Sequence, residues 1–189
     1  GAKRKIVVVG FGAESVETAL GNQAEYVVQQ EQLGTGHAVM QASEILKDFE
    51  GTVMVLCGDT PLLQGQTLAK LFAEHQAAKA SATVLTACMP DPAGYGRVIR
   101  NENGQVLKIV EQKDAASGEL AVNEVNTGIY CFERKALFEA LNSINCNNMQ
   151  GEYYLTDVIG ILAKSQDKVW AVQVDEYQET LGINSRMQL

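Results

Sequence analysis

Short apolar runs that alternate with helix-like stretches constrain the fold of this chain more than any other feature. Residues 6–9 read IVVV and residues 53–57 read VMVLC, with a shorter apolar run at 26–28. Stretches with helical spacing of apolar residues follow these runs, at residues 13–20, 36–47 and 67–80. Strands that are apolar on both faces and separated by helices indicate a mostly parallel sheet covered by helices on both sides. The pattern therefore predicts a Rossmann-like α/β fold.

The second half of the chain has a different rhythm. Residues 95–112 alternate apolar and polar side chains around the ENG sequence at 102–104, which predicts a β-hairpin. Further strands are predicted at residues 127–132 and 169–174, and further helices at 136–141 and 153–163. The chain has 189 residues and shows neither a repeat nor a linker. We therefore expect one domain over residues 1–189, with a hairpin-rich flank that can cover a ligand.

Charge and cysteine content exclude several classes of function. The formal net charge of -8 disfavours nucleic acid as a partner, because a phosphate backbone requires a basic face. No apolar run is long enough to span a membrane, and no signal peptide is recognisable. The cysteines form no C-x-x-C pair, which argues against a zinc site. Cys57, Cys88 and Cys131 lie in apolar runs, so we expect buried, reduced thiols and a cytoplasmic protein.

The sequence CGDTPLL places a carboxylate at the end of a predicted strand. Gly58 allows the chain to turn there, and Pro61 prevents the strand from continuing. Ligands of open α/β sheets bind outside the carboxyl ends of the strands, and the Asp59 carboxylate is a hard ligand suited to Mg²⁺. The alternative is that Asp59 caps the next helix or opens an Asx turn. These residues alone leave both possibilities open.

A second candidate site lies in QQEQLGTGHA, residues 29–38. Two glycines flank Thr35 immediately before a predicted helix, where backbone N–H groups can approach an anion or a flat ring. Gln29 and Gln32 carry amides that both donate and accept hydrogen bonds, as recognition of a base edge requires. The alternative is a plain glycine-rich helix start with Thr35 as its cap.

Other familiar motifs are absent or incomplete. Gly10-Phe11-Gly12 follows a strand, but Ser15 stands where a dinucleotide fingerprint requires its third small residue, usually glycine. The chain contains neither a Walker loop nor a recognisable nucleophile motif. Its two histidines, His37 and His75, are expected at a helix end and on a helix surface. A nicotinamide site and a covalent mechanism are therefore not supported.

Seven motifs in one order make the sequence specific. They are QQEQLGTGHA, CGDTPLL, GYGRVIRN, IVEQKDA, NEVNTGIY, QGEYYLTDVI and GINSRMQL. In this order and spacing the chain resembles, from end to end, the uridyltransferase domain of bacterial bifunctional N-acetylglucosamine-1-phosphate uridyltransferases, which also carry a glucosamine-1-phosphate acetyltransferase. The resemblance implies a nucleotide-diphospho-sugar transferase fold with a sugar-binding flank.

The resemblance also implies a reaction. UTP and N-acetylglucosamine 1-phosphate would give UDP-N-acetylglucosamine, a cell-wall precursor, and pyrophosphate, with Mg²⁺ as the cofactor. The attacking phosphate oxygen is already anionic, so the enzyme needs no activating base. Catalysis then consists of positioning and charge neutralisation around an in-line displacement.

The family's nucleotide-binding positions can be carried over residue by residue. The matching positions here are Gln29, Gly34, Thr35, Cys57, Gly58 and Asp59. Gln29, Gly34 and Thr35 fall where the family contacts the uracil. Asp59 and Asn184, in GINSR, fall on the two protein ligands of the Mg²⁺.

The family's amino-sugar positions fall on four residues of the second half: Gly96, Glu111, Asn126 and, as a less secure candidate, Thr156. Glu111 can accept hydrogen bonds from sugar hydroxyls, and Asn126 can both donate and accept. Each also has an alternative that needs no ligand. Gly96 could relieve crowding between strands, Glu111 could pair with Lys113, and the asparagines at 126 and 184 could stabilise turns.

The chain departs from the family at its two ends. The family begins with a strand and a glycine-rich loop that supply phosphate-binding N–H groups, an arginine and a lysine, and this chain begins at GAKRKIVVVG. It also ends before the left-handed β-helix that carries the acetyltransferase and through which the family forms trimers. We therefore expect residues 1–189 alone to be inactive. A non-catalytic nucleotide-sugar-binding module and a sister enzyme for another sugar phosphate remain the alternatives.

Overall fold

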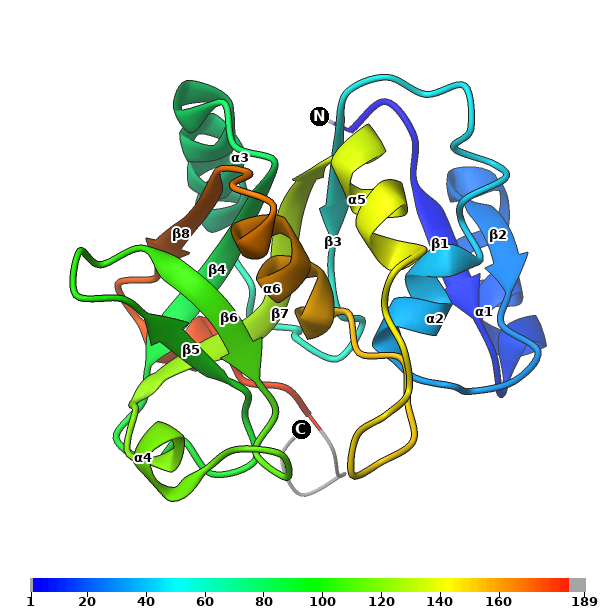
Figure 1. Cartoon of the computed structure of the whole chain (residues 1–189). Coiled ribbons are helices and arrows are strands. Elements are labelled where there is room, and N and C mark those ends of the chain that lie inside the picture. The colour runs from blue at the N-terminus through cyan, green and yellow to red at the C-terminus, as the bar shows by residue number, and fades with distance from the viewer. Residues whose placement is uncertain (1, 184–189) are drawn as a thin grey trace.

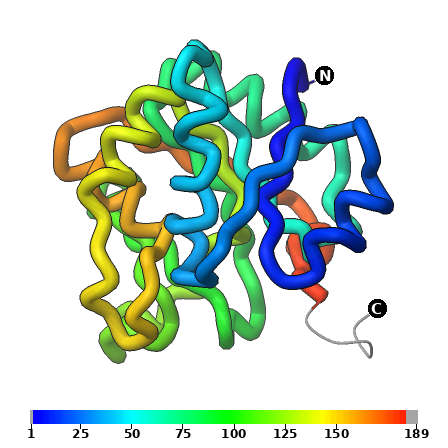
Figure 2. The backbone as a smooth tube through the Cα atoms, turned by 90° about the vertical axis from the view of Figure 1, so that its right-hand side faces the viewer, coloured from blue at the N-terminus to red at the C-terminus, as the bar shows by residue number. Residues whose placement is uncertain are grey.

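The computed structural model describes residues 2–183 and shows an α/β fold with two sheets (Figure 1). The smaller sheet pairs β1 (Ile6–Val9) in parallel with β2 (Glu25–Val28). The helix α1 (Ala13–Leu20) and the 3-10 turn η1 (Gly21–Gln23) connect these two strands. This β1–α1–β2 unit is the blue part of the chain, which lies nearest the viewer in Figure 2.

The larger sheet has six strands in the order β6-β5-β7-β4-β8, and β3 also pairs with β7. Its strands are β3 (Thr52–Val55), β4 (Ala82–Cys88), β5 (Arg97–Arg100), β6 (Val106–Val110), β7 (Glu124–Glu133) and β8 (Val169–Gln173). The pairing is parallel between β4 and β8 and antiparallel between β7 and each of β3, β4 and β5. The predicted hairpin is confirmed as β5 and β6, which pair antiparallel.

The α/β class is therefore confirmed, but the sheet is mixed and not mostly parallel. The reason is β7, a long strand that runs against all of its neighbours. The apolar patterns of the sequence predicted only part of β7 and did not predict β4 as a strand. Six of the seven β4 residues are buried, so β4 has no polar face that would reveal a strand period.

Helices cover the larger sheet on both faces. On one face, α5 (Arg134–Leu141) and α6 (Thr156–Lys164) pack on a core that includes Val84, Tyr130 and Phe132. On the other face, α3 (Gly65–Ala78) packs through Leu71 on a second core that includes Leu85 and Ile129. The remaining short elements are α2 (Thr35–Met40), α4 (Ser117–Leu120) and η2 (Tyr177–Thr180). The helix predicted at 36–47 is thus shorter than expected and continues as turns.

The strands β1 and β3 are less buried than their apolar sequences predicted. All four residues of β3 and three of the four in β1 are only half-buried. Several large apolar side chains of the first third of the chain are exposed, namely those of Phe11, Val16, Leu20, Val28, Leu56 and Leu62. In the described chain β1 pairs only with β2, and β3 pairs only with β7, so each has one open edge.

Three predictions about single side chains are wrong. Cys57 and Cys88 are exposed, because each lies at the end of a strand where the chain leaves the sheet; Cys131 is buried as expected. His75 is not on a helix surface but is 2% exposed, and its Nδ1 lies 2.9 Å from the hydroxyl of Thr83. Within residues 2–183, no helix has the length and apolar character needed to cross a membrane.

Candidate functional site

Asp59 follows the carboxyl end of β3 and lies against the end of the described chain. Its backbone carbonyl accepts a hydrogen bond of 2.9 Å from the N–H of Ile183. Its carboxylate is so close to Gly182 that a Cβ at that position would lie 3.1 Å from Oδ2. The next helix, α3, begins at Gly65 with Gln64 before it, so Asp59 is not its cap. Asn184, the second predicted metal ligand, lies outside the described residues.

The side chain of Cys57, just after β3, contacts Gly128 in an irregular part of β7. Its Sγ lies 3.5 Å from the Gly128 carbonyl oxygen, and a Cβ on Gly128 would come within 2.7 Å of that sulfur. Gly128 has a φ of 78°, which a residue with a Cβ rarely adopts. Gly128 is therefore required both by its backbone conformation and by its contact with Cys57. Cys57 as a residue is exposed, but its sulfur packs against Gly128; this partial desolvation raises the pKa of the Cys57 thiol, and the negative charge of Asp59 adds to the shift.

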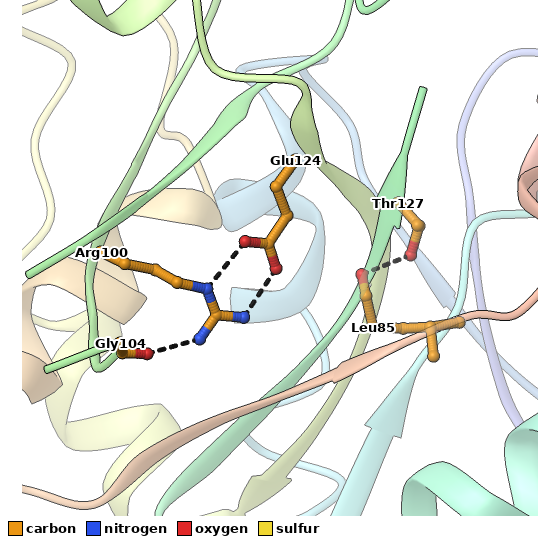
Figure 3. A network of polar contacts seen from close by, with 5 residues as sticks. All are labelled: Leu85, Arg100, Gly104, Glu124 and Thr127. Carbon is orange, nitrogen blue, oxygen red and sulfur yellow. Dashed lines mark hydrogen bonds and ion pairs between the residues drawn. The ribbon is translucent and has the colours of Figure 1, made fainter. Parts of the chain in front are cut away.

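A bulge in β7 explains this irregularity. Thr86 of β4 pairs with Asn126 and Val84 pairs with Tyr130, so residues 127–129 face Leu85 alone. The Thr127 hydroxyl donates a hydrogen bond of 2.8 Å to the Leu85 carbonyl oxygen, as Figure 3 shows. This bond satisfies a buried carbonyl group in the bulge.

Asn126 stands at the start of the bulge and faces two neighbours. Its Oδ1 accepts a hydrogen bond of 3.1 Å from the Gly128 N–H, and its own N–H donates to the Gly96 carbonyl oxygen at 2.9 Å. The alternative role, in which Asn126 stabilises a turn, is therefore present in the structure. This role occupies the side-chain oxygen; the amide group also contacts the Tyr130 phenol as a donor.

Glu111 lies at the end of β6, opposite Gly96. Its Oε1 accepts a hydrogen bond of 3.0 Å from the hydroxyl of Thr156, the first residue of α6. Burial raises the pKa of the Glu111 carboxyl group; the Thr156 bond opposes this shift, and nearby carboxylates such as Asp114 reinforce it. The predicted alternative of a Glu111–Lys113 pair is not seen, because Lys113 donates to Gln150 instead. Crowding at Gly96 is seen, since a Cβ there would lie 3.2 Å from Ile109.

Tyr130 is a neighbour of these residues that the sequence analysis missed. It is 2% exposed and stacks on Phe132 with ring centroids 5.3 Å apart. Burial raises the pKa of the Tyr130 phenol well above its usual range; a hydrogen bond with Asn126 opposes this, and the charges of Glu111 and Cys57 reinforce it. An aromatic residue inside an apolar strand gave no signal beyond core packing.

The glycine turn before α2 is fixed by backbone packing. Thr35 accepts a hydrogen bond of 3.1 Å from the Leu155 N–H through its hydroxyl, and Gly36 donates one of 2.8 Å to the Tyr153 carbonyl oxygen. Gly34 has a φ of 105°, and a Cβ there would lie 2.7 Å from the same carbonyl oxygen. The turn thus docks on the segment just before α6. Thr35 does not cap its own helix.

Gln29 is oriented by this turn. Its Nε2 lies 3.2 Å from the Gly34 carbonyl oxygen and 3.0 Å from Nδ1 of His37. Its backbone N–H donates to the Val9 carbonyl oxygen, which ties it to the end of β1. His37 is thus a further neighbour of the candidate site, although the sequence indicated only a helix-end position.

A continuous row of contacts therefore joins the described candidate residues. It passes from Gln29 through the turn to residues 155–156, then through Glu111 and Gly96 to β7, and ends at Cys57 and Asp59. Two surface hollows, one on α1 and one between α5 and α6, share no residue with this row. Residues 2–183 contain no cluster of three or more His, Cys, Asp or Glu side chains that could hold a metal ion by themselves.

Comparison with known proteins identifies the family. Residues 5–178, nearly the whole chain, match the nucleotidyl transferase family. The chain belongs to the nucleotidyl transferase family. Two curated relatives of this nucleotidyl transferase chain, each a bifunctional protein GlmU, come from Bacillus mycoides (53% identical) and a Geobacillus species (52% identical). Both matches cover 189 residues, 100% of this chain but only 41% of the relative.

A solved structure supports the fold of this nucleotidyl transferase chain. UDP-glucose pyrophosphorylase complexed with UDP-glucose superposes with a TM-score of 0.67 over 94% of this chain and 76% of that one. The sequence identity is 15%, so this likeness concerns the fold alone.

Proposed function

We propose that this chain forms the body of a uridyltransferase domain that makes UDP-N-acetylglucosamine and pyrophosphate from UTP and N-acetylglucosamine 1-phosphate. The observation that carries the proposal is the row of contacts from Gln29 to Asp59, because it gathers candidate residues that are far apart in the sequence. The 53% identity to a bifunctional protein GlmU supports this choice of substrates within the nucleotidyl transferase family.

The residues along the row have the chemistry that the two substrates require. At one end, the Gln29 amide and the Gly34–Thr35 turn offer donors and acceptors for the edge of a uracil. In the middle, Glu111 offers a half-buried carboxylate, and Asn126 offers amide hydrogens for the hydroxyl and acetamido groups of the sugar. The sugar phosphate would lie between these groups and Asp59, with its phosphate oxygen in line with the α-phosphorus of UTP.

Mg²⁺ fits the Asp59 end of the row. The Asp59 carboxylate is exposed and faces the 182–183 segment, which directly precedes the predicted ligand Asn184. Proteins usually hold Mg²⁺ with one or two carboxylates and complete its octahedron with phosphate oxygens and water. Such a site needs no cluster of acidic residues. When bound, the ion supplies neutralising charge at the phosphates.

We also propose that an upstream segment completes the phosphate site. The open edges of β1 and β3 and the exposed apolar side chains around them, such as Phe11 and Val28, are consistent with a further strand in this region. The family resemblance puts a strand and a glycine-rich loop with an arginine and a lysine there.

In the complete protein, a C-terminal β-helix would form the trimer. Light scattering of the complete protein and of residues 1–189 tests the trimer by comparing their masses.

The proposed activity is tested with the complete protein encoded by the gene. Pyrophosphate release is measured with UTP and N-acetylglucosamine 1-phosphate, and in parallel with other sugar phosphates and other nucleoside triphosphates. We expect Mg²⁺-dependent turnover with the first pair only. Preference for another pair would assign a sister enzyme. Binding of UDP-N-acetylglucosamine without any turnover would indicate a binding module.

A further inference from the structure

The β5–β6 hairpin carries two of the proposed sugar-binding residues at its open end. Arg97 pairs with Val110 as the last pair of this hairpin, and the next residues outward are Gly96 and Glu111. Glu111 lies so close to Gly96 that a Cβ there would be 3.4 Å from Oε2. Gly96 is held by Asn126 and Glu111 by Thr156, but neither of these hydrogen bonds joins one arm of the hairpin to the other beyond the Arg97–Val110 pair. A contact across this open end would set the separation of the two residues.

Arg97 provides that contact from the opposite face of the hairpin. Successive side chains of a strand point to opposite faces, and Val98 belongs to the core under α6 whereas Tyr95 packs on the core under α3. Arg97 therefore lies on the α3 side, away from Glu111. It is nevertheless only 3% exposed.

The guanidinium group of Arg97 binds the chain on both sides of the open end. Its Nη1 donates to the Tyr95 carbonyl oxygen, and its Nη2 lies 3.4 Å from Oε1 of Gln112. The same Gln112 oxygen accepts a hydrogen bond from the Gly94 N–H. Arg97 and Gln112 thus link residues 94–95, just before Gly96, to the residue just after Glu111. We call this pair of side chains the Arg97–Gln112 latch.

Stability alone gives little reason to keep an arginine here. Among residues 2–183, Arg97 has no carboxylate partner, and its buried Nε has no hydrogen-bond partner. A buried charge without a paired carboxylate is costly, and an apolar side chain of similar volume is often at least as stable. Arg100, three residues further along, differs because it forms two short hydrogen bonds with Glu124 and one with Gly104 (Figure 3).

We propose that Arg97 is a positioning residue whose latch with Gln112 sets the spacing between Gly96 and Glu111 and so determines how tightly the sugar phosphate binds. This inference rests on the proposed function. The latch acts on the sugar-binding part of the site, whereas the turn next to Gln29 docks on residues 153–155 through hydrogen bonds that involve neither Arg97 nor Gln112.

The test uses the complete protein with Arg97→Met, Gln112→Ala and the double variant. Arg97→Met keeps most of the apolar stem and removes the donors. Each single variant is expected to raise the KM for N-acetylglucosamine 1-phosphate about tenfold, the effect of losing roughly one net hydrogen bond, while the KM for UTP and kcat change less than about twofold. The double variant should be no worse than about twofold beyond the single ones, because both substitutions break the same latch.

Arg100→Met is the matched control. It removes a guanidinium from the same strand, but its hydrogen bonds go to Glu124 and Gly104 and not to Gln112 or residues 94–95, so the KM for the sugar phosphate should not change. Gln112→Ala keeps the test decisive if Arg97→Met does not fold, because Gln112 is only half-buried. Calorimetric titration with the sugar phosphate provides a second measure of the same loss.

Three results would overturn the inference: an unchanged KM for the sugar phosphate, equal increases for both substrates, or additive effects in the double variant. Measurements on the unsubstituted protein distinguish failure of the proposed function from failure of this inference. If that protein neither binds nor consumes N-acetylglucosamine 1-phosphate, the proposed function fails and the inference fails with it. If it is active and the variants give one of the three results above, the proposed function stands and only the inference fails.

Discussion

Glu111→Gln separates a binding role of the Glu111 carboxylate from a structural one. Burial raises the pKa of this carboxyl group, so the folded protein disfavours its charged form. For an acid with a raised pKa, stability is lost as the pH rises from the unfolded pKa through the folded pKa. At neutral pH, the charged Glu111 therefore destabilises the fold, and Gln, which is neutral and keeps an acceptor for Thr156, should raise the midpoint of unfolding.

The same substitution should weaken binding of the sugar phosphate. A hydrogen bond to a charged group contributes about 1.5–3 kcal/mol, and 1.4 kcal/mol corresponds to tenfold, so the KM for the sugar phosphate should rise by roughly 10- to 100-fold. In the unsubstituted enzyme this KM should also rise as the pH falls toward the raised pKa of Glu111, and it should do so at a higher pH than an ordinary glutamate would cause. The Gln variant should lack that dependence.

Steady-state kinetics of the complete protein between about pH 5 and 8, together with urea unfolding, measure both effects. Glu119→Gln is the control, since Glu119 lies outside the row of contacts and is a half-buried glutamate like Glu111, with Lys108 as its partner. A Glu111→Gln variant that is less stable and keeps the normal KM would refute the reasoning. Glu111 would then be a structural partner of Thr156 and not a sugar ligand.

Three further predictions concern the bulge, the metal and the phosphate site. Thr127→Val removes the hydroxyl that donates to the buried Leu85 carbonyl and should lower the free energy of unfolding by about 1–3 kcal/mol in urea titrations, and an unchanged midpoint would contradict this. Asp59→Ala should abolish Mg²⁺-dependent pyrophosphate release with little loss of stability, because Asp59 is exposed; retained turnover would remove it from the site. Because the proposed function assigns phosphate-binding groups to an upstream segment, residues 1–189 expressed alone should release no pyrophosphate; one missing charge-stabilising group already costs about 10²–10³ in rate. A well-folded, active 1–189 would show that the phosphate site is misplaced.

The sequence alone was sufficient to predict features that depend on residues close together in the chain. Alternating apolar runs and helical stretches predicted the α/β class, and the ENG turn predicted the β5–β6 hairpin. Ordered motifs identified the candidate residues, including Asp59 at a strand end. These features depend on periodicity, turn residues and short spacings, which are properties of neighbouring residues in the chain.

Tertiary structure decided the features that depend on distant partners. The sheet is mixed because β7 pairs with three strands, and no local pattern specifies the direction of a partner. Asn126 lies at the start of a bulge, which exists because β7 has extra residues opposite Leu85. Only the strand pairing reveals these extra residues. Gly34 and Gly36, on either side of Thr35 at the start of α2, suggested a ligand loop, and both are also required because the carbonyl oxygen of Tyr153, more than a hundred residues later, leaves no room for a Cβ.

The same holds for single side chains whose environment is set by long-range packing. His75 has the sequence neighbours of a surface residue, and it is buried because α3 lies on β4 beside Thr83. Arg97 stands in an alternating strand that gave no sign of a buried charge, and its partners Tyr95 and Gln112 meet only when the hairpin closes. Sequence thus determined which groups this chain has and where the chain turns. Folding decided which of those groups lose water and which meet, because burial and hydrogen bonding depend on contacts between segments that are far apart in the chain.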